Sequence, residues 1–199
     1  MKTFRRISLI ALAIIAVLCA YAASKPDSFR VERSIVINAP AEKIFPLMND
    51  LQEFTRWSPY EGRDPEMKKT FSAVTAGRGA HYSWDGNKQV GAGRMEITQS
   101  IPLQQVIVQL DFSRPFEAHN VVAFGLTPIA GGTRTTWAME GPMPFISKLM
   151  SIFLDFDQMV GKDFEDGLEK LKMLAEKAEK PIQAAPIAAP GNTPGTALQ

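Results

Sequence analysis

The stretch from Met159 to Lys180 carries the longest helical pattern in the sequence, and it constrains the fold because one of its faces must be covered. Apolar residues recur along it at steps of three and four, namely Val160, Phe164, Leu168, Leu171, Leu174 and Ala178. This spacing places them on one stripe of a helix, with charged residues on the opposite side. Pro181 ends the pattern. We therefore expect a long C-terminal helix that packs against another layer of the protein.

The first 23 residues have the pattern of an export segment. Lys2, Arg5 and Arg6 precede an uncharged apolar run from Ile7 to Ala23. Its length fits both a signal peptide and a membrane-spanning helix. Small residues near Ala22 offer a cleavage site, which would leave a secreted or periplasmic protein, whereas the unbroken run favours a retained anchor. Because basic residues before the run stay in the cytoplasm, we expect one N-terminal anchor in the cell membrane and an extracytoplasmic (periplasmic) domain.

A strand and two short helices are predicted after the apolar run. Residues 29–37 alternate between apolar and polar, as a half-buried strand does. Pro40 then stands in the first turn of a predicted helix, and Pro46 limits its length or kinks it. A second short helix is predicted over residues 51–57, before Ser58 and Pro59 end it.

About six further strands are predicted from period-two alternation between turn signals. Asp85-Gly86-Asn87 and Ala130-Gly131-Gly132 are the clearest of these signals. Consecutive strands joined by such short turns pair antiparallel. The predicted strands cover residues 67–74, 79–84, 94–100, 105–112, 120–127 and 133–140.

Two segments stand apart from the strand series. The segment from Phe145 to Met159 is apolar nearly all round, which predicts a short helix that is buried on several sides or offers apolar surface to a ligand, membrane or partner. Residues 181–199 are rich in Ala and Pro, lack charge and have no periodicity, which predicts a disordered tail. The globular domain is therefore expected to span residues 29–180.

The order of elements predicts an α+β fold of about seven strands, in which a curved antiparallel sheet wraps around the C-terminal helix. In this order and in several runs, the chain resembles the helix-grip superfamily of START-like proteins (SRPBCC), which includes the polyketide cyclase/dehydrase and lipid transport family. Its bacterial membrane-anchored members are the most similar. The resemblance extends over residues 29–178 and includes the runs at 33–40, 57–60, 82–87, 90–95 and 135–137. It implies a cavity between sheet and helix, often for an apolar ligand, and it does not imply one reaction.

Aromatic residues are the candidates for lining such a cavity. Tyr82 and Trp84 share one strand face, and Phe112, Trp137 and Met139 share the concave surface if each strand keeps its alternation. Trp57 and Tyr60 are expected at one rim. The alternative is that these side chains complete a dry core. The full set of candidate ligand-binding residues is Trp57, Tyr60, Tyr82, Trp84, Phe112, Trp137, Met139, Phe153 and Phe164.

Residues with catalytic or metal-binding chemistry are few. His81 and His119 are the only histidines, and Cys19, the only cysteine, lies inside the apolar run, so no zinc-ligand spacing is present. Alternation sends Asp111 and Glu140 to the outer face of their strands. We therefore expect no metal, no cofactor and no assigned catalytic residue. Without the N-terminal basic residues, acidic residues outnumber basic ones by two, which is no signature of nucleic-acid binding.

Three functions remain open from the sequence. The leading hypothesis is a membrane-anchored domain that binds a hydrophobic small molecule or lipid in a cavity under the C-terminal helix, with the segment 145–156 as lid or entrance. The second is an enzyme of the cyclase or dehydratase kind that uses His119 or a buried carboxylate in the same cavity. The third is a ligand-free interaction module at the membrane, which predicts a filled core and an exposed apolar patch on residues 145–156.

Overall fold

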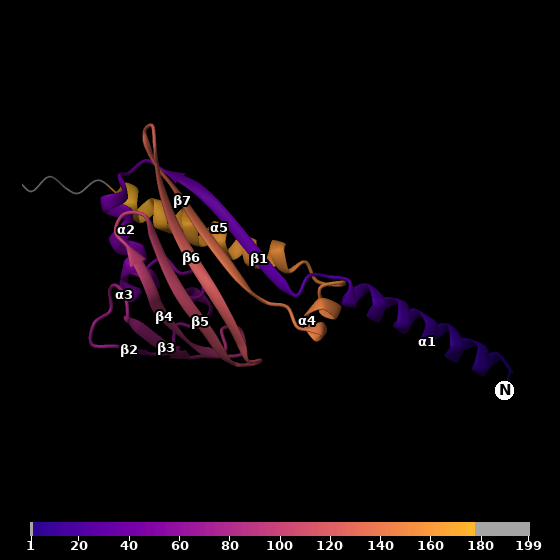
Figure 1. Ribbon diagram of the computed structural model, residues 1–199. Coiled ribbons are helices and arrows are strands. Elements are labelled where there is room, and N and C mark those ends of the chain that lie inside the picture. The colour runs from indigo at the N-terminus through magenta and orange to yellow at the C-terminus, as the bar shows by residue number, and fades with distance from the viewer. Residues whose placement is uncertain (1, 178–199) are drawn as a thin grey trace, which may run out of the picture.

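The computed structural model describes residues 2–177, so the predicted tail at 181–199 and the last residues of the predicted C-terminal helix lie outside the described residues. Seven strands form one antiparallel sheet in the order β1-β7-β6-β5-β4-β3-β2, and α5 lies across it (Figure 1). The α+β helix-grip fold expected from the sequence is confirmed. The strands are β1 (Ser28–Ile37), β2 (Lys68–Phe71), β3 (His81–Asp85), β4 (Ala92–Ile101), β5 (Gln105–Arg114), β6 (Ala118–Ile129) and β7 (Gly132–Pro142).

The helices follow the predicted order with shifted boundaries. Pro46 lies inside α2, and Asp50 caps α3 by accepting a hydrogen bond from the amide of Gln52 at 2.8 Å. A short 3-10 helix, η1, follows them. The helices are α1 (Lys2–Ala23), α2 (Ala41–Asn49), α3 (Leu51–Thr55), η1 (Glu61–Arg63), α4 (Phe145–Met150) and α5 (Phe156–Glu176).

The start of α5 differs from the sequence expectation. The helix begins at Phe156 rather than at Met159, and α4 ends at Met150, so the predicted apolar helix 145–159 is divided by a turn. The reason is an N-cap that the apolar pattern hid, since the Asp155 carboxylate accepts a hydrogen bond from the amide of Gln158 at 2.9 Å. Residues 151–155, which lie between the two helices, therefore form a loop.

The helix α5 packs along β1 and holds that edge of the sheet. Arg33 of β1 pairs with Asp157 at 2.8 Å and with Glu165 at 3.0 Å, and both carboxylates belong to α5. At the other end of the strand, the amide of Asn38 donates to the Glu176 carboxylate at 2.7 Å. The apolar stripe of α5 therefore faces the sheet, as the sequence predicts.

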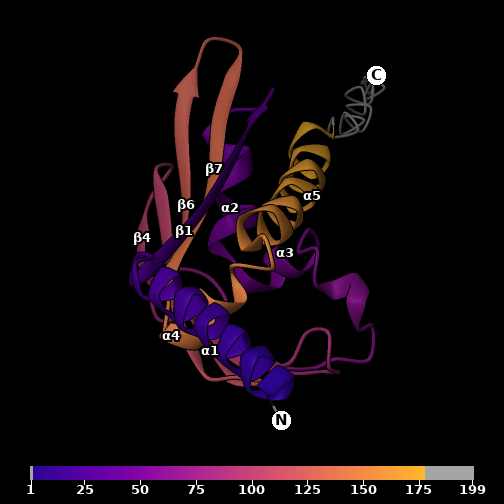
Figure 2. The same cartoon turned by 90° about the vertical axis from the view of Figure 1, so that its right-hand side faces the viewer.

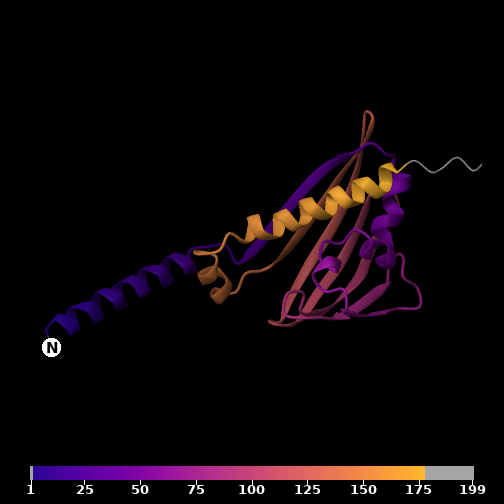
Figure 3. The same ribbon diagram turned by 180° about the vertical axis from the view of Figure 1, so that it is seen from behind.

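The helix α1 extends from the domain at the end where β1 begins (Figures 2 and 3). Residues Thr3–Ala23 are long and apolar enough to cross a membrane, and their side chains are almost entirely exposed. Only four residues, 24–27, separate α1 from β1. The end of α1 contacts α4, and Ala22 is fully buried there.

Candidate functional site

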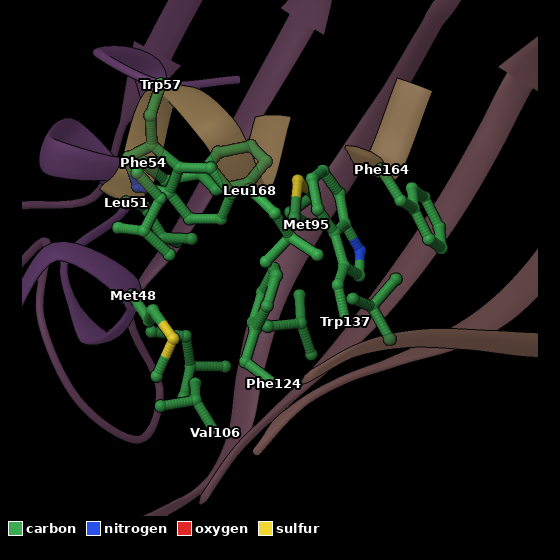
Figure 4. Close-up of a cluster of buried hydrophobic side chains, with 14 of the residues drawn as sticks. Met48, Leu51, Phe54, Trp57, Met95, Val106, Phe124, Trp137, Phe164 and Leu168 are labelled. Carbon is green, nitrogen blue, oxygen red and sulfur yellow. The ribbon is translucent and has the colours of Figure 1, made fainter. Parts of the chain in front are cut away.

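Three of the predicted ligand-binding residues meet in the centre of the core (Figure 4). The rings of Trp137 on β7 and Phe164 on α5 stack with centroids 4.2 Å apart and planes at 9°. Trp57 stands edge-on to Trp137 at 5.3 Å, and Phe54 and Phe124 complete the cluster. Trp57 is fully buried, so the rim position expected for it is wrong. The turn after α3 directs this side chain inward, where its Nε1 donates to the carbonyl of Leu47 at 2.8 Å.

A second group of predicted residues lies around β3. Tyr82 stacks on Phe71 at 5.2 Å, and Trp84 stands edge-on to Phe112 at 5.4 Å. Trp84 Nε1 donates to the carbonyl of Val90 at 3.1 Å. Strand alternation places Tyr82, Trp84 and Phe112 on the concave face, as expected. Met139 is buried on the same face of β7 as Trp137.

Tyr60 is half-buried beside η1 and close to α5. The guanidinium of Arg63 lies over its ring at 5.1 Å and pairs with Asp163 of α5. Burial raises the pKa of Tyr60, and the nearby Asp163 carboxylate raises it further. Burial likewise raises the pKa of Tyr82, with a smaller effect from Glu61. Both phenols therefore stay neutral at physiological pH.

Two buried polar atoms of β7 contact no hydrogen-bonding partner within the described protein, Trp137 Nε1 and Thr135 Oγ1. Both side chains point to the concave face, since they are two residues apart on one strand. A buried donor left unpaired costs about 1–3 kcal/mol. These atoms are therefore two buried polar positions on the concave face whose hydrogen-bonding capacity is unused within the described protein.

Two open grooves formed by the described residues lack the lining expected for a cavity under α5. One, of about 450 Å³, lies at the start of α2 and includes Ala39, Leu103 and Gly132 in its lining. The other, of about 490 Å³, lies between the start of β1 and the loop that joins α4 to α5. The second groove is the stronger candidate for an apolar ligand because three phenylalanines line it, whereas no aromatic residue lines the first.

The groove beside β1, which we call the β1 groove, is lined by seven apolar and four polar or charged residues. Phe29 and Val31 supply one wall, and the rings of Phe29 and Phe156 meet edge-on at 4.9 Å. Val31 is also part of the buried core. The full lining consists of Phe29, Arg30, Val31, Met143, Ser151, Ile152, Phe153, Leu154, Asp155, Phe156 and Asp157.

Phe153 is the one predicted ligand-binding residue in the β1 groove. It is 72% exposed, so it does not lie in the interior, where the other eight are buried or half-buried. Sequence reasoning missed Phe29, Ile152 and Phe156 as lining residues. Phe29 was expected only as a strand residue, and the apolar run that contains the other two concealed the turn that brings them to the groove.

His119, the histidine of the enzyme hypothesis, lies on the outer face of the sheet. Its Nδ1 is 2.7 Å from the Asp111 carboxylate, because Asp111 and His119 face each other across β5 and β6. This contact raises the pKa of His119 and lowers the pKa of Asp111. His81 is half-buried, with Nδ1 3.2 Å from the carbonyl of Gly79. Neither histidine faces the interior, and the described residues contain no cluster of three potential metal ligands.

Comparison with known families identifies the chain. A family model described as polyketide cyclase / dehydrase and lipid transport matches residues 28–176. The chain belongs to this family. No curated protein matches the sequence.

Solved structures confirm the fold of this polyketide cyclase / dehydrase and lipid transport protein. A Mesorhizobium loti protein is 18% identical with a TM-score of 0.57, over 76% of this chain and 99% of its own. A Chromobacterium violaceum protein is 15% identical with a TM-score of 0.53, over 77% of this chain and 100% of its own. The di-domain ARO/CYC protein StfQ of the steffimycin biosynthetic pathway is 10% identical with a TM-score of 0.55, over 75% of this chain and 51% of its own.

Proposed function

We propose that this family member is anchored in the cell membrane by α1, carries its domain on the extracytoplasmic side, and binds an apolar small molecule or lipid in the β1 groove. The observation that carries the proposal is a groove of about 490 Å³ with seven apolar residues in its lining, in which Ser151 contacts Lys25 just after the end of α1. A volume of this size suits a small organic molecule or part of a lipid chain.

The predicted residues have different roles in this proposal. Phe153 contacts the ligand, together with Phe29, Ile152 and Phe156 of the groove. The other eight predicted residues belong to the packed interior, where they are buried or half-buried, and they do not line the groove. Burial of apolar surface gives the binding energy, at about 25 cal/mol per Å² before the costs of ordering.

Retention of α1 is part of the proposal. The cleavage site considered near Ala22 lies where α1 contacts α4, and Ala22 is fully buried there. Lys25 Nζ further donates to the carbonyl and hydroxyl of Ser151 at 3.0 and 2.9 Å. A segment whose C-terminal end is held to the domain in this way suits an anchor better than a discarded signal peptide.

The packed interior favours a second candidate function, a ligand-free interaction module at the membrane. The Trp137–Phe164 stack fills the space that the sequence assigned to a ligand, and apolar residues of α4 are exposed. Among the described residues, the carboxyl and histidine groups with shifted pKa values lie at the surface, namely Asp27, Asp111, His119 and Asp157. No observation of this kind favours the cyclase or dehydratase alternative.

Native mass spectrometry of the detergent-extracted full chain tests the proposal, followed by organic extraction of any bound molecule. The variant Ile152→Trp places a larger side chain in the β1 groove, and Val74→Trp places the same side chain on an exposed loop as a control. We expect a stoichiometric apolar molecule in the native protein and in Val74→Trp, and its loss in Ile152→Trp. An apo mass in several growth conditions would contradict ligand binding and favour the interaction module.

A further inference from the structure

Six large apolar residues of α4, the loop that follows it and the first turn of α5 are exposed, and we call them the α4 surface. Their exposed fractions run from 48% at Leu154 to 72% at Phe153. A contiguous apolar surface on a folded domain marks a contact with a membrane or another molecule. The α4 surface consists of Phe145, Ile146, Met150, Phe153, Leu154 and Met159.

The α4 surface lies directly beside the end of α1. The two helices α1 and α4 contact each other, and Figures 1 and 2 both show α4 at the point where α1 leaves the domain. Of the domain helices, α4 is thus the one adjacent to the predicted membrane span. A membrane that receives α1 therefore has its surface next to α4.

The connection between α1 and the domain is short and held at several points. Residues 24–27 reach at most about 14 Å when extended, at about 3.5 Å per residue. They are not free to extend, because Lys25 is bonded to Ser151 and the Asp27 carboxylate accepts from Lys148 Nζ at 2.5 Å. The Asp27 carbonyl also accepts from the amide of Met143 at 2.7 Å. The α4 surface therefore stays near the membrane once α1 is inserted.

The charged residues near the α4 surface have partners in the protein, since Asp155 caps α5 and Asp157 pairs with Arg33. Lys148 is the one charged residue of α4, and it is buried and paired with Asp27. The side of α4 that remains open to its surroundings carries Phe145, Ile146 and Met150. Apolar side chains of this kind enter the boundary between headgroups and acyl chains.

We propose that the α4 surface docks on the bilayer that α1 enters, and that it holds the domain in one orientation with the β1 groove at the membrane. This inference rests on the proposed anchoring by α1, and it is independent of whether the groove binds a ligand. Phe153 and Leu154 belong to both the α4 surface and the groove lining. Docking therefore brings the mouth of the groove to the lipid surface.

Site-specific labelling of the full chain in phosphatidylcholine nanodiscs tests the proposal. In a Cys19→Ser background, an environment-sensitive fluorophore is attached at Phe153→Cys or Met159→Cys. Met173→Cys is the matched control, because Met159 and Met173 are 59% and 58% exposed on the same helix and lie about 21 Å apart at 1.5 Å per residue. We expect lipids with a quencher in the headgroup or upper acyl chain to quench the first two labels, and the Met173 label to be unaffected.

Equal quenching at all three positions, or none at Phe153 and Met159, would overturn docking. A double variant, Phe145→Ser with Ile146→Ser, removes two exposed apolar side chains without opening the core, and it should weaken quenching at Met159. Label-to-label contact between two copies in one nanodisc, with no quenching by lipid, would show that a second copy covers the surface and would also overturn the proposal. Carbonate extraction and intact mass separately report whether α1 is inserted and retained, so a failed anchor is distinguished from failed docking.

Discussion

Trp137 of β7 and Phe164 of α5 stack nearly parallel, with ring centroids 4.2 Å apart, although 27 positions separate them in the sequence. The contact joins the sheet to the C-terminal helix at the centre of the aromatic cluster. Gly167 permits it, because a Cβ at this position would lie 2.6 Å from the Trp137 ring. With glycine at position 167, the backbone of α5 approaches the Trp137 ring more closely than it could with any other residue type there.

Phe164→Ala should lower the free energy of unfolding by about 3–5 kcal/mol, since it removes a buried ring and leaves a cavity. Met173→Ala on the exposed side of the same helix should change it by less than about 0.5 kcal/mol. Chemical denaturation of the detergent-solubilised chain measures both. Similar losses for the two variants would contradict the assigned packing of α5.

The three tryptophans differ in their hydrogen bonds, and Trp→Phe variants should reflect this. Trp57 Nε1 donates to the carbonyl of Leu47, whereas Trp137 Nε1 has no partner in the described protein. Trp57→Phe should therefore cost about 1 kcal/mol more than Trp137→Phe in free energy of unfolding. A larger loss for Trp137→Phe would indicate that its indole donates to a bound molecule.

Two glycines of α5 should differ in how much stability is lost on substitution by alanine. Gly167→Ala should destabilise the protein by about 1–3 kcal/mol, because the new methyl group meets the rigid Trp137 ring. Gly161→Ala meets the guanidinium of Arg33, which lies at the end of a flexible side chain, and helix propensity favours alanine by about 1 kcal/mol. We expect that variant to be nearly neutral. Thermal unfolding measures the stability of both variants. An equal loss of stability would refute the explanation.

The His119–Asp111 pair should stabilise the fold in a limited pH range. The raised pKa of His119 gives stability that is present below its ordinary value of 6.5 and is lost as pH rises through the raised value. The lowered pKa of Asp111 gives stability that is present above 3.8 and is lost as pH falls through the lowered value. The pair therefore contributes most between about pH 3.8 and 6.5.

Proton NMR of the histidine ring measures this effect. The His119 signal, assigned with a His81→Gln variant, should titrate above 6.5 and move toward that value in Asp111→Asn. A His119 titration that does not change in Asp111→Asn would show that the pair is absent in solution.

The joint between α1 and the domain should loosen when the Asp27–Lys148 pair is broken. Asp27→Asn leaves the ammonium of Lys148 buried without a carboxylate, so hydrogen exchange at the Met143 amide and in α4 should accelerate. Asp166→Asn, which removes the exposed partner of Lys162 on α5, is the control. Unchanged exchange in Asp27→Asn would mean that the pair does not hold the joint.

Local patterns in the sequence predict the element order and most side-chain faces, because alternation in strands and the stripe of α5 are set by nearby residues. Tyr82 and Trp84 face inward for this reason. The stack of Trp137 on Phe164 depends on tertiary packing between distant segments, so no local pattern contains it. The turn that contains Phe153 was not predicted, because the apolar run hides the Asp155 cap that follows it.

The alternation of apolar and polar residues also fails to predict a register shift in the sheet. The register of β4 against β5 shifts between Ile97 and Gln99, which leaves Gln99 exposed although it shares a period-two face with buried Ile97. A bulge of this kind inserts one residue without changing composition, so the sequence pattern alone does not locate it.

The open sheet ends in β1 on one side and in β2 on the other, and anchored copies of this protein would meet at high density in the plane of a membrane. Unpaired strand edges invite intermolecular pairing. Here α5 covers β1, and β2 is only four residues long with Lys68 and Lys69 at its start. Both edges are thus poor templates for strand addition. This would protect anchored copies that are crowded in one membrane from aggregation.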